Sequence, residues 1–228
     1  MADLVVALDL PDGASALRVA DRLAGTVGWF KVGAQLYAAE GPGVVRELTA
    51  RGARVFLDLK WHDIPSAVGG AVTASAMMGA SLATVHLSGG RAMLEAAARA
   101  ASGRLSLVGV GVLTSLDAAA YAEVVGREVG DLGAELQRLA RMGMEAGLDG
   151  AVCSPHEAAR LRVSLGQRAL LVVPGIRRAG EGTGDQARTA SPAEAVAAGA
   201  DLLVVGRPVT GVADPKGAAL ALLEEIRR

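Results

Sequence analysis

Short apolar runs alternate with longer amphipathic stretches along the 228-residue chain, and this alternation limits the possible fold more than any other feature. Eight runs have the composition of buried strands: Leu4–Asp9, Trp29–Val32, Arg54–Lys60, Leu82–His86, Leu105–Leu113, Gly150–Cys153, Ala169–Val173 and Asp201–Val205. The other stretches predict helices over Gly13–Ala24, Gly43–Arg51, Ser66–Gly79, Arg91–Ala101, Leu132–Ala146, Pro155–Ser164, Pro192–Ala198 and Pro215–Arg228. Eight βα units without a break in composition predict a single-domain α/β fold, a parallel (β/α)8 or TIM barrel over residues 1–228.

Side-chain alternation on the strands predicts which residues point into the barrel, because successive side chains of a strand face opposite sides. In the third predicted strand Asp58 and Lys60 share one face, and the apolar Val55 and Leu57 share the other. We expect the charged face to point into the barrel and the apolar face to pack beneath helices. By the same alternation Asp9 belongs to the inward face of the first strand.

The chain has only three lysines against twenty arginines, and two of these lysines lie among carboxylates at strand ends. Lys60 stands between Asp58 and Asp63, and Lys31 lies near the end of the second predicted strand. An ammonium can give up a proton, which a guanidinium cannot. Active sites of such barrels gather at the carboxyl ends of the strands, so the array predicts a catalytic centre. A structural ion pair is the alternative, but the expected convergence of Asp9, Lys31 and Asp63 on one rim favours function.

For each of the other reactive side chains a structural role is an alternative to a chemical one. Asp63 precedes an Ile-Pro pair, as a helix N-cap would, although beside the lysine array we prefer a catalytic role for it. His62 and His86 lack the spacing of paired metal ligands, so we predict pocket-wall or packing roles and no metal site. Cys153, the only cysteine, is predicted to be a buried core thiol.

A glycine-rich loop, Pro174 to Arg188, follows the seventh predicted strand. Loops of this length are usually lids or binding loops, and barrels often bind phosphate after strands seven and eight, beside a short helix. We expect Gly206 to admit a phosphate close to the backbone, Arg207 to supply charge and Gln186 to donate from the loop. A mobile surface loop with exposed arginines is the alternative. These features together predict an enzyme that acts on a phosphorylated small molecule.

Composition excludes several other functions. The net charge of −1 gives no basic surface for nucleic acid. The N-terminus lacks the basic start of a secretory signal, and no segment reaches the ~18 apolar residues of a membrane span. One cysteine excludes an intramolecular disulfide and fits a reducing compartment. We expect a cytoplasmic protein that binds neither membrane nor nucleic acid.

The motifs closely resemble those of the orotidine 5′-phosphate decarboxylase family. The likeness covers most of the chain, in Ala7–Asp9, Phe30–Gly33, Asp58–Pro65, Val85–His86, Ser88–Gly90, Leu113–Ser115, Pro174–Arg177, Gly184–Gln186 and Val205–Pro208. The Asp-x-Lys-x-x-Asp core alone is shared with sister barrels, whereas the later Pro-Gly-Ile-Arg and Gly-Arg-Pro segments make the likeness specific. The resemblance implies decarboxylation of orotidine 5′-phosphate to UMP, the last step of UMP biosynthesis, by a homodimer without metal or organic cofactor.

The resemblance also implies roles for individual residues. Lys31, Asp58, Lys60 and Asp63 would form one network, with Asp63 reaching the active site of the neighbouring subunit. Lys60 would stabilise the carbanion at C6 and then protonate it. The implied substrate contacts, from ribose and pyrimidine to phosphate, come from Asp9, Lys31, Ile64, Pro65, Ala67, Thr114, Arg177, Gln186, Gly206 and Arg207.

The chain departs from the family pattern at several positions. Bacterial members usually continue Asp-Ile-Pro with Asn-Thr, whereas this chain has Ser66 and Ala67. By the resemblance, the missing threonine hydroxyl would remove one ribose contact across the dimer, worth about 0.5–1.5 kcal/mol. Arg178 replaces a common proline.

A sister phosphosugar barrel would use Mg²⁺ and need another acid near Lys31. A non-catalytic nucleotide-binding barrel is a further alternative, which the intact array disfavours.

Overall fold

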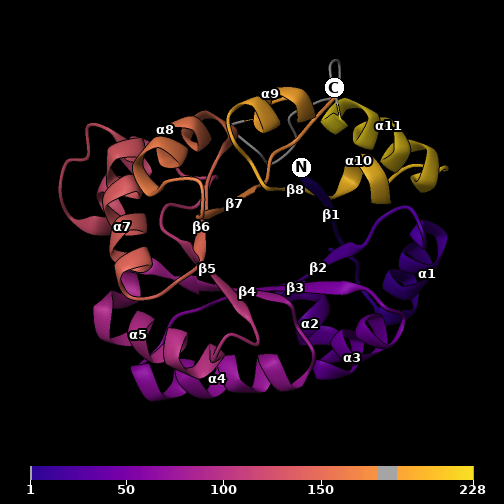
Figure 1. The fold of residues 1–228 in the computed structure, drawn as a ribbon, viewed down its shortest axis with the longest axis horizontal. Helices are drawn as coiled ribbons and strands as arrows, with labels where there is room; N and C mark the ends of the chain where they lie inside the picture. The colour runs from indigo at the N-terminus through magenta and orange to yellow at the C-terminus, as the bar shows by residue number, and fades with distance from the viewer. Residues whose placement is uncertain (1, 179–188, 228) are drawn as a thin grey trace.

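Eight parallel strands close into a barrel in chain order in the computed structural model, which describes residues 2–178 and 189–227 (Figure 1). Parallel pairing of the first strand with both the second and the eighth closes the sheet. The predicted (β/α)8 fold is therefore confirmed. The strands are β1 Asp3–Ala7, β2 Trp29–Gly33, β3 Arg54–Trp61, β4 Leu82–His86, β5 Ser106–Val110, β6 Gly150–Val152, β7 Leu170–Val173 and β8 Leu202–Val205.

Helices cover the outside of the barrel, and side-chain caps fix where several of them begin. Asp12, Asp117 and Asp131 each accept a backbone N–H three residues on, and Ser154 and Ser191 form capping boxes. The helices are α1 Gly13–Leu23, α2 Ala34–Glu40, α3 Pro42–Ala50, α4 Pro65–Met77, α5 Gly90–Ala101, α6 Ala118–Val125, α7 Leu132–Glu145, α8 Pro155–Leu165, α9 Pro192–Ala197, α10 Arg207–Thr210 and α11 Pro215–Arg227, with a 3₁₀ turn η1 at Leu87–Gly89.

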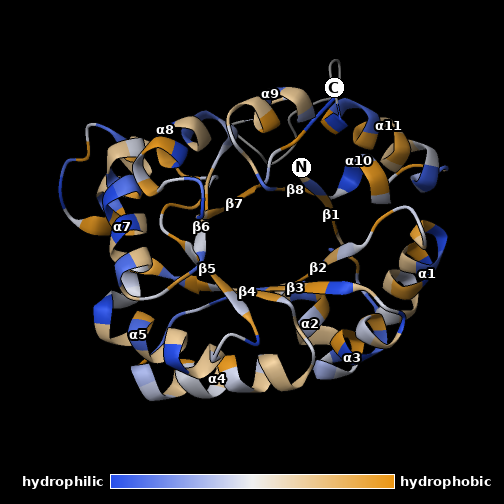
Figure 2. Ribbon diagram, in the orientation of Figure 1, coloured by the Kyte–Doolittle hydropathy of each residue, from blue (hydrophilic) through white to orange (hydrophobic). Residues whose placement is uncertain are grey.

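Two apolar layers hold these elements together, and Figure 2 shows the mostly hydrophobic strands inside helices, most of which carry hydrophilic residues on their outer sides. One layer fills the barrel and includes Val5, Phe56 and Val204. The other lies between sheet and helices and includes Val55 and Leu57. This division confirms the predicted alternation on the third strand. The opposite face of that strand is therefore free to carry charged groups to the barrel mouth.

The structure corrects some predicted boundaries. β5 ends at Val110 rather than at residue 113. The following residues leave the sheet, so Leu113 turns to the barrel mouth and keeps 38% of its surface exposed. α2 and α6 were not predicted, because both are short and one directly follows a strand. Within the described residues, none of the helices combines the length and apolarity that crossing a bilayer requires.

Candidate active site

A cavity of about 440 Å³ opens at the carboxyl ends of the strands. Its floor is apolar and comes from strands on all sides of the barrel, at Ala7, Phe56, Val152, Val172 and Val204. Charged side chains line its upper part. The volume is typical of a small-molecule site, and a few polar groups above an apolar floor are the usual arrangement for orienting a ligand.

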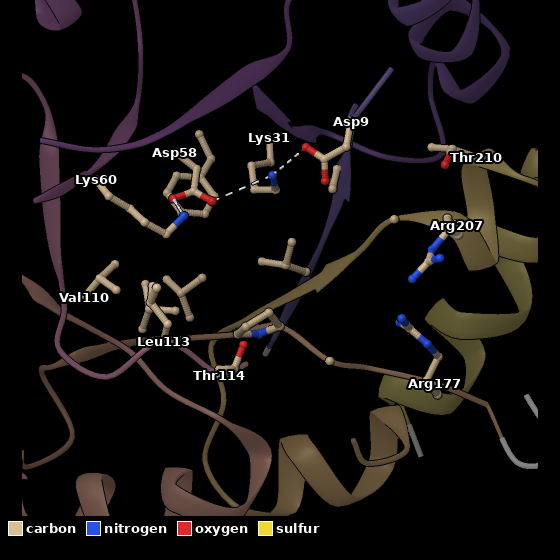
Figure 3. A pocket seen from close by; sticks show the side chains of 18 of the residues that line it. Asp9, Lys31, Asp58, Lys60, Val110, Leu113, Thr114, Arg177, Arg207 and Thr210 are labelled. Carbon is tan, nitrogen blue, oxygen red and sulfur yellow. Dashed lines mark hydrogen bonds and ion pairs between the residues drawn. The ribbon is translucent and has the colours of Figure 1, made fainter. Parts of the chain in front are cut away.

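Four charged side chains of alternating sign form one wall of this cavity (Figure 3). Lys31 Nζ lies 2.8 Å from Asp9 Oδ1 and 3.7 Å from Asp58 Oδ2. Lys60 Nζ lies 2.9 Å from Asp58 Oδ1. The side chains of Lys31 and Asp58 are only 11% and 14% exposed. We call Asp9, Lys31, Asp58 and Lys60 the charged array; its two ammonium and two carboxylate groups balance, which makes the burial of Lys31 and Asp58 tolerable.

Local features of Gly33 and Lys60 shape this array. A Cβ at Gly33 would lie 2.7 Å from Asp9 Oδ1 and 2.9 Å from Lys31 Nζ, so a larger residue would displace the side-chain ends of that ion pair. Lys60 itself has a φ of +52°, in the left-handed region that non-glycine residues rarely adopt. Such a conformation costs on the order of 1–3 kcal/mol and persists where surrounding contacts impose it. The site therefore holds its lysine in a strained backbone.

Two arginines lie across the cavity from Lys60, and Figure 3 shows their guanidinium groups directed toward each other. Arg207 follows Gly206 at the start of α10. Arg177 belongs to the segment after β7, where an isolated bridge between Ile176 and Ala190 closes the base of the loop. The cavity thus has a lysine–carboxylate end and a guanidinium end, which suits a ligand that is anionic at a distance from its reacting atom.

Most predicted site residues meet in this one cavity, which the structure lines with Asp9, Lys31, Asp58, Lys60, Thr114, Arg177, Gly206 and Arg207. Gln186 lies outside the described residues. Asp63, Ile64, Pro65 and Ala67 do not line the cavity of the single chain, and all four are exposed. The expectation that Asp63 shares the rim within one chain is therefore wrong. The chain leaves the barrel after Trp61, and the Asp63 carboxylate instead accepts the backbone N–H of Ile64 at 2.6 Å.

The two histidines stack beside the site rather than inside it. The rings of His62 and His86 are 5.0 Å apart, and His86 Nδ1 lies 2.6 Å from Ser88 Oγ. Burial, reinforced by the charges of His62 and Lys60, holds the pKa of His86 below its ordinary value. Across residues 2–178 and 189–227, no cluster of three or more His, Cys, Asp or Glu side chains could hold a metal ion. Cys153 is buried, as predicted.

Sequence reasoning missed part of the site. Val110, Leu113 and Thr210 also line the cavity, and Thr84 contacts the charged array from below the pocket surface. Alternation on the fourth predicted strand could have indicated Thr84, since a lone hydroxyl in the apolar run Leu82–Val85 needs a buried partner. Arg178, noted as a departure from the family pattern, pairs with Glu225 of α11 at 2.8 Å.

Several proteins with a similar sequence are named orotidine 5′-phosphate decarboxylase. The sequence model of the orotidine 5′-phosphate decarboxylase / HUMPS family matches residues 2–222. The orotidine 5′-phosphate decarboxylase of Anaeromyxobacter sp. (strain K) is 52% identical over 219 residues, 96% of either chain. The one from Halorhodospira halophila is 50% identical over 98% of this chain and 95% of its own. The crystal structure of the Lactobacillus acidophilus enzyme has a TM-score of 0.89 at 32% identity, with both chains fully covered. The chain therefore belongs to the orotidine 5′-phosphate decarboxylase / HUMPS family.

Proposed function

We propose that this protein decarboxylates orotidine 5′-phosphate to UMP, the last step of UMP biosynthesis, with Lys60 as the group that meets the reacting carbon. One observation carries the proposal: a single cavity holds Lys60 and Asp58 at one end and Arg177 with Arg207 at the other. The substrate has the matching polarity, a carboxylate on the pyrimidine and a phosphate beyond the ribose. Full-length similarity to proteins named for this reaction supports the same conclusion.

The chemistry requires negative charge to be stabilised at C6. When the bond to the carboxyl carbon breaks, carbon dioxide leaves and the electron pair remains in an orbital in the plane of the ring, where the π system cannot delocalise it. A preorganised ammonium next to C6 stabilises that charge as it develops. Lys60 then donates a proton to C6, which completes UMP, and recovers a proton from solvent. No electrons are exchanged with a cofactor in this scheme.

Asp58 and Lys31 act through the position of Lys60. Asp58 Oδ1 accepts a hydrogen bond from Lys60 Nζ at 2.9 Å, and Lys31 balances the charge of Asp58 from the other side. Asp58 would in addition crowd the departing carboxylate, which would add to the charge stabilisation. Asp9 and Lys31 are suited to bind the ribose hydroxyls, since their ion pair borders the middle of the cavity between its two ends.

The phosphate end supplies binding energy at a distance. Arg177 and Arg207 would form charge-assisted hydrogen bonds with the phosphate oxygens, with Gly206 and Gln186 as further donors. Enzymes lower barriers by about 8–23 kcal/mol, and part of that can come from interactions far from the reacting atom. Thr114, at the rim between the two ends, would contact the pyrimidine edge.

We further propose that a homodimer in the cytoplasm is the working unit, with Asp63, Ile64, Pro65 and Ala67 completing the neighbour's site. These residues form a continuous exposed segment directly after the β3 strand that carries Lys60, and the Ile64 side chain is 65% exposed. An exposed segment that follows this strand and lines no cavity of its own chain supports a role in the site of a neighbouring subunit. A mixture of Lys60→Ala and Asp63→Asn proteins tests this. Random exchange makes half the dimers mixed, each with one intact site, so about a quarter of wild-type activity should return. No recovery on mixing two stable inactive dimers would contradict shared sites.

The reaction itself is tested by the loss of orotidylate ultraviolet absorbance when purified protein is added, with and without excess chelator. We expect equal rates in both, whereas a Mg²⁺-dependent phosphosugar barrel would lose activity in chelator. Tight UMP binding without turnover would instead favour a non-catalytic binding protein. Lys60→Ala should bind UMP but lose decarboxylation, and near-normal turnover in that variant would refute the role of Lys60.

A further inference from the structure

Thr84 is a fully buried hydroxyl beneath the charged array, on β4 rather than on any strand that contributes to the array. Its Oγ1 accepts the backbone N–H of Lys60 at 2.8 Å. The same oxygen donates to Asp58 Oδ1 at 3.0 Å. A threonine hydroxyl has one proton and accepts through its lone pairs, so these two contacts use it in both directions.

The hydroxyl fills a break in the sheet. β3 and β4 pair regularly through Leu57 opposite Ala83, and the next paired residues are Trp61 and Val85. Three residues of β3 therefore lie opposite Thr84 alone, as in a β-bulge. A backbone N–H buried in such a bulge loses its partner in the ladder and needs another acceptor. Thr84 Oγ1 is that acceptor for Lys60.

These contacts close a ring around the reacting lysine. The Lys60 backbone N–H donates to Thr84 Oγ1, Thr84 Oγ1 donates to Asp58 Oδ1, and Lys60 Nζ donates to the same Asp58 oxygen at 2.9 Å. One side chain thereby fixes both the backbone from which the ammonium extends and the carboxylate that orients it. Lys60 adopts its left-handed backbone conformation within this ring of hydrogen bonds, and these hydrogen bonds can maintain that conformation.

We propose that Thr84 is a positioning residue that sets the geometry of Lys60 and Asp58 without touching substrate. The kinetic test of this role rests on the proposed function, because a change in the geometry of Lys60 alters turnover only if Lys60 acts on the substrate. Because Thr84 lies below the cavity wall rather than among its lining residues, its loss should alter turnover far more than ligand binding.

Three variants test the proposal. Thr84→Val keeps the shape and removes the hydroxyl, and Thr84→Ser keeps the hydroxyl. Thr49→Val is the matched control, since the Thr49 hydroxyl donates only to the Val45 carbonyl within α3. We expect Thr84→Val to lower kcat by about 10- to 100-fold, the effect of displacing a reacting group by about 1 Å, while UMP affinity changes less than about threefold. Thr84→Ser should recover most of kcat, and Thr49→Val should match the wild type.

A crystal structure of Thr84→Val gives a second readout that does not depend on turnover. We expect Lys60 to leave the positive φ region and its Nζ to shift from Asp58. Unchanged kcat in a folded Thr84→Val protein, or an unchanged Lys60 backbone, would overturn the proposal. An inactive wild type would instead refute the proposed function and leave the crystallographic readout to decide on Thr84. If Thr84→Val does not fold, Thr84→Cys, whose thiol is a weak donor and acceptor, is held to the same criteria.

Discussion

Replacement of Lys31 by methionine tests whether alternating charge holds the site together. Lys31 Nζ lies 2.8 Å from Asp9 Oδ1 and 3.7 Å from Asp58 Oδ2, and its side chain is 11% exposed. Methionine fills a similar space without a charge. In the Lys31→Met protein the Asp9 and Asp58 carboxylates would lose the ammonium that lies between them, so the folded state should be destabilised.

The size of the effect follows from burial. At 3.7 Å and an effective dielectric constant of about 20, the attraction between Lys31 and Asp58 is about 4–5 kcal/mol before desolvation. Asp58 is 14% exposed, so little of that is screened, whereas Asp9 is 53% exposed and its pair adds at most about 1 kcal/mol. The variant no longer has to bury the Lys31 ammonium, and this gain offsets part of the lost attraction. The net decrease in the free energy of unfolding is then roughly 2–4 kcal/mol. For a chain of this length, that lowers Tm by roughly 4–16 °C.

Urea and thermal unfolding at one protein concentration measure the change, since an oligomer would make Tm concentration-dependent. The decisive comparison is a double-mutant cycle of Lys31→Met with Asp58→Asn. We expect the double variant to be more stable than the sum of the single losses predicts, by about 1–3 kcal/mol. Arg91→Met, which breaks an exposed and solvent-screened pair with Glu145, is the control and should leave the unfolding free energy close to that of the wild type. Additive single losses, or a Lys31→Met protein as stable as the wild type, would refute the reasoning.

Three further changes have expected outcomes. Arg207→Ala should lower kcat/KM for orotidine 5′-phosphate roughly 10- to 150-fold, the value of a hydrogen bond to a charged group, and weaken UMP inhibition while leaving uridine inhibition unchanged; equal weakening of both inhibitors would contradict a phosphate role. Burial lowers the pKa of His86 in the folded protein. As the pH drops below ~6.5, the imidazole of the unfolded chain is protonated before that of the folded protein, so the stability of the folded state should fall over that range. Urea titrations at several pH values should show a shallower dependence in His86→Phe, and an unchanged slope would contradict the assignment. Gly150→Ala would place a Cβ against the backbone carbonyl of Leu170 and should cost about 1–3 kcal/mol or more in urea unfolding, whereas Gly43→Ala, with open space around it, should not destabilise; similar losses in both would argue against a steric cause.

The barrel could be predicted because its strands are apolar on both faces and its helices are not. Each strand is buried by side chains on two sides, so its composition differs sharply from that of the stretches around it. The elements that were missed lack this contrast. α6 is a short alanine-rich helix whose start depends on the Asp117 cap, and α2 continues directly from the end of β2 at Gly33. Boundary errors, such as the long prediction for β5, arise because apolar residues that line a cavity resemble apolar residues of a strand.

The meeting of site residues from distant segments could also be predicted, because a parallel barrel brings all carboxyl strand ends to one rim. Asp9, Lys31 and Arg207 come from three different strand ends and line one cavity. Sequence spacing failed for Asp63. It comes only three positions after Lys60, but the chain has already turned outward at that point, and an exposed acid cannot be assigned to a neighbouring subunit from spacing alone.

The geometry of the charged part of β3 cannot be fully predicted from the alternation of side chains along a strand. Alternation assumes a regular strand, yet Asp58 and Lys60 lie in a bulge where three residues face Thr84 alone. The inward direction of both side chains was nevertheless predicted correctly, since Asp58 and Lys60 both line the cavity. The alternation of residues in the sequence indicates neither the free-energy cost of the left-handed Lys60 conformation nor the Thr84 hydroxyl on another strand that maintains it. Local strain held by distant contacts is expected where function needs a fixed geometry, so the departure from regular structure itself points to Lys60.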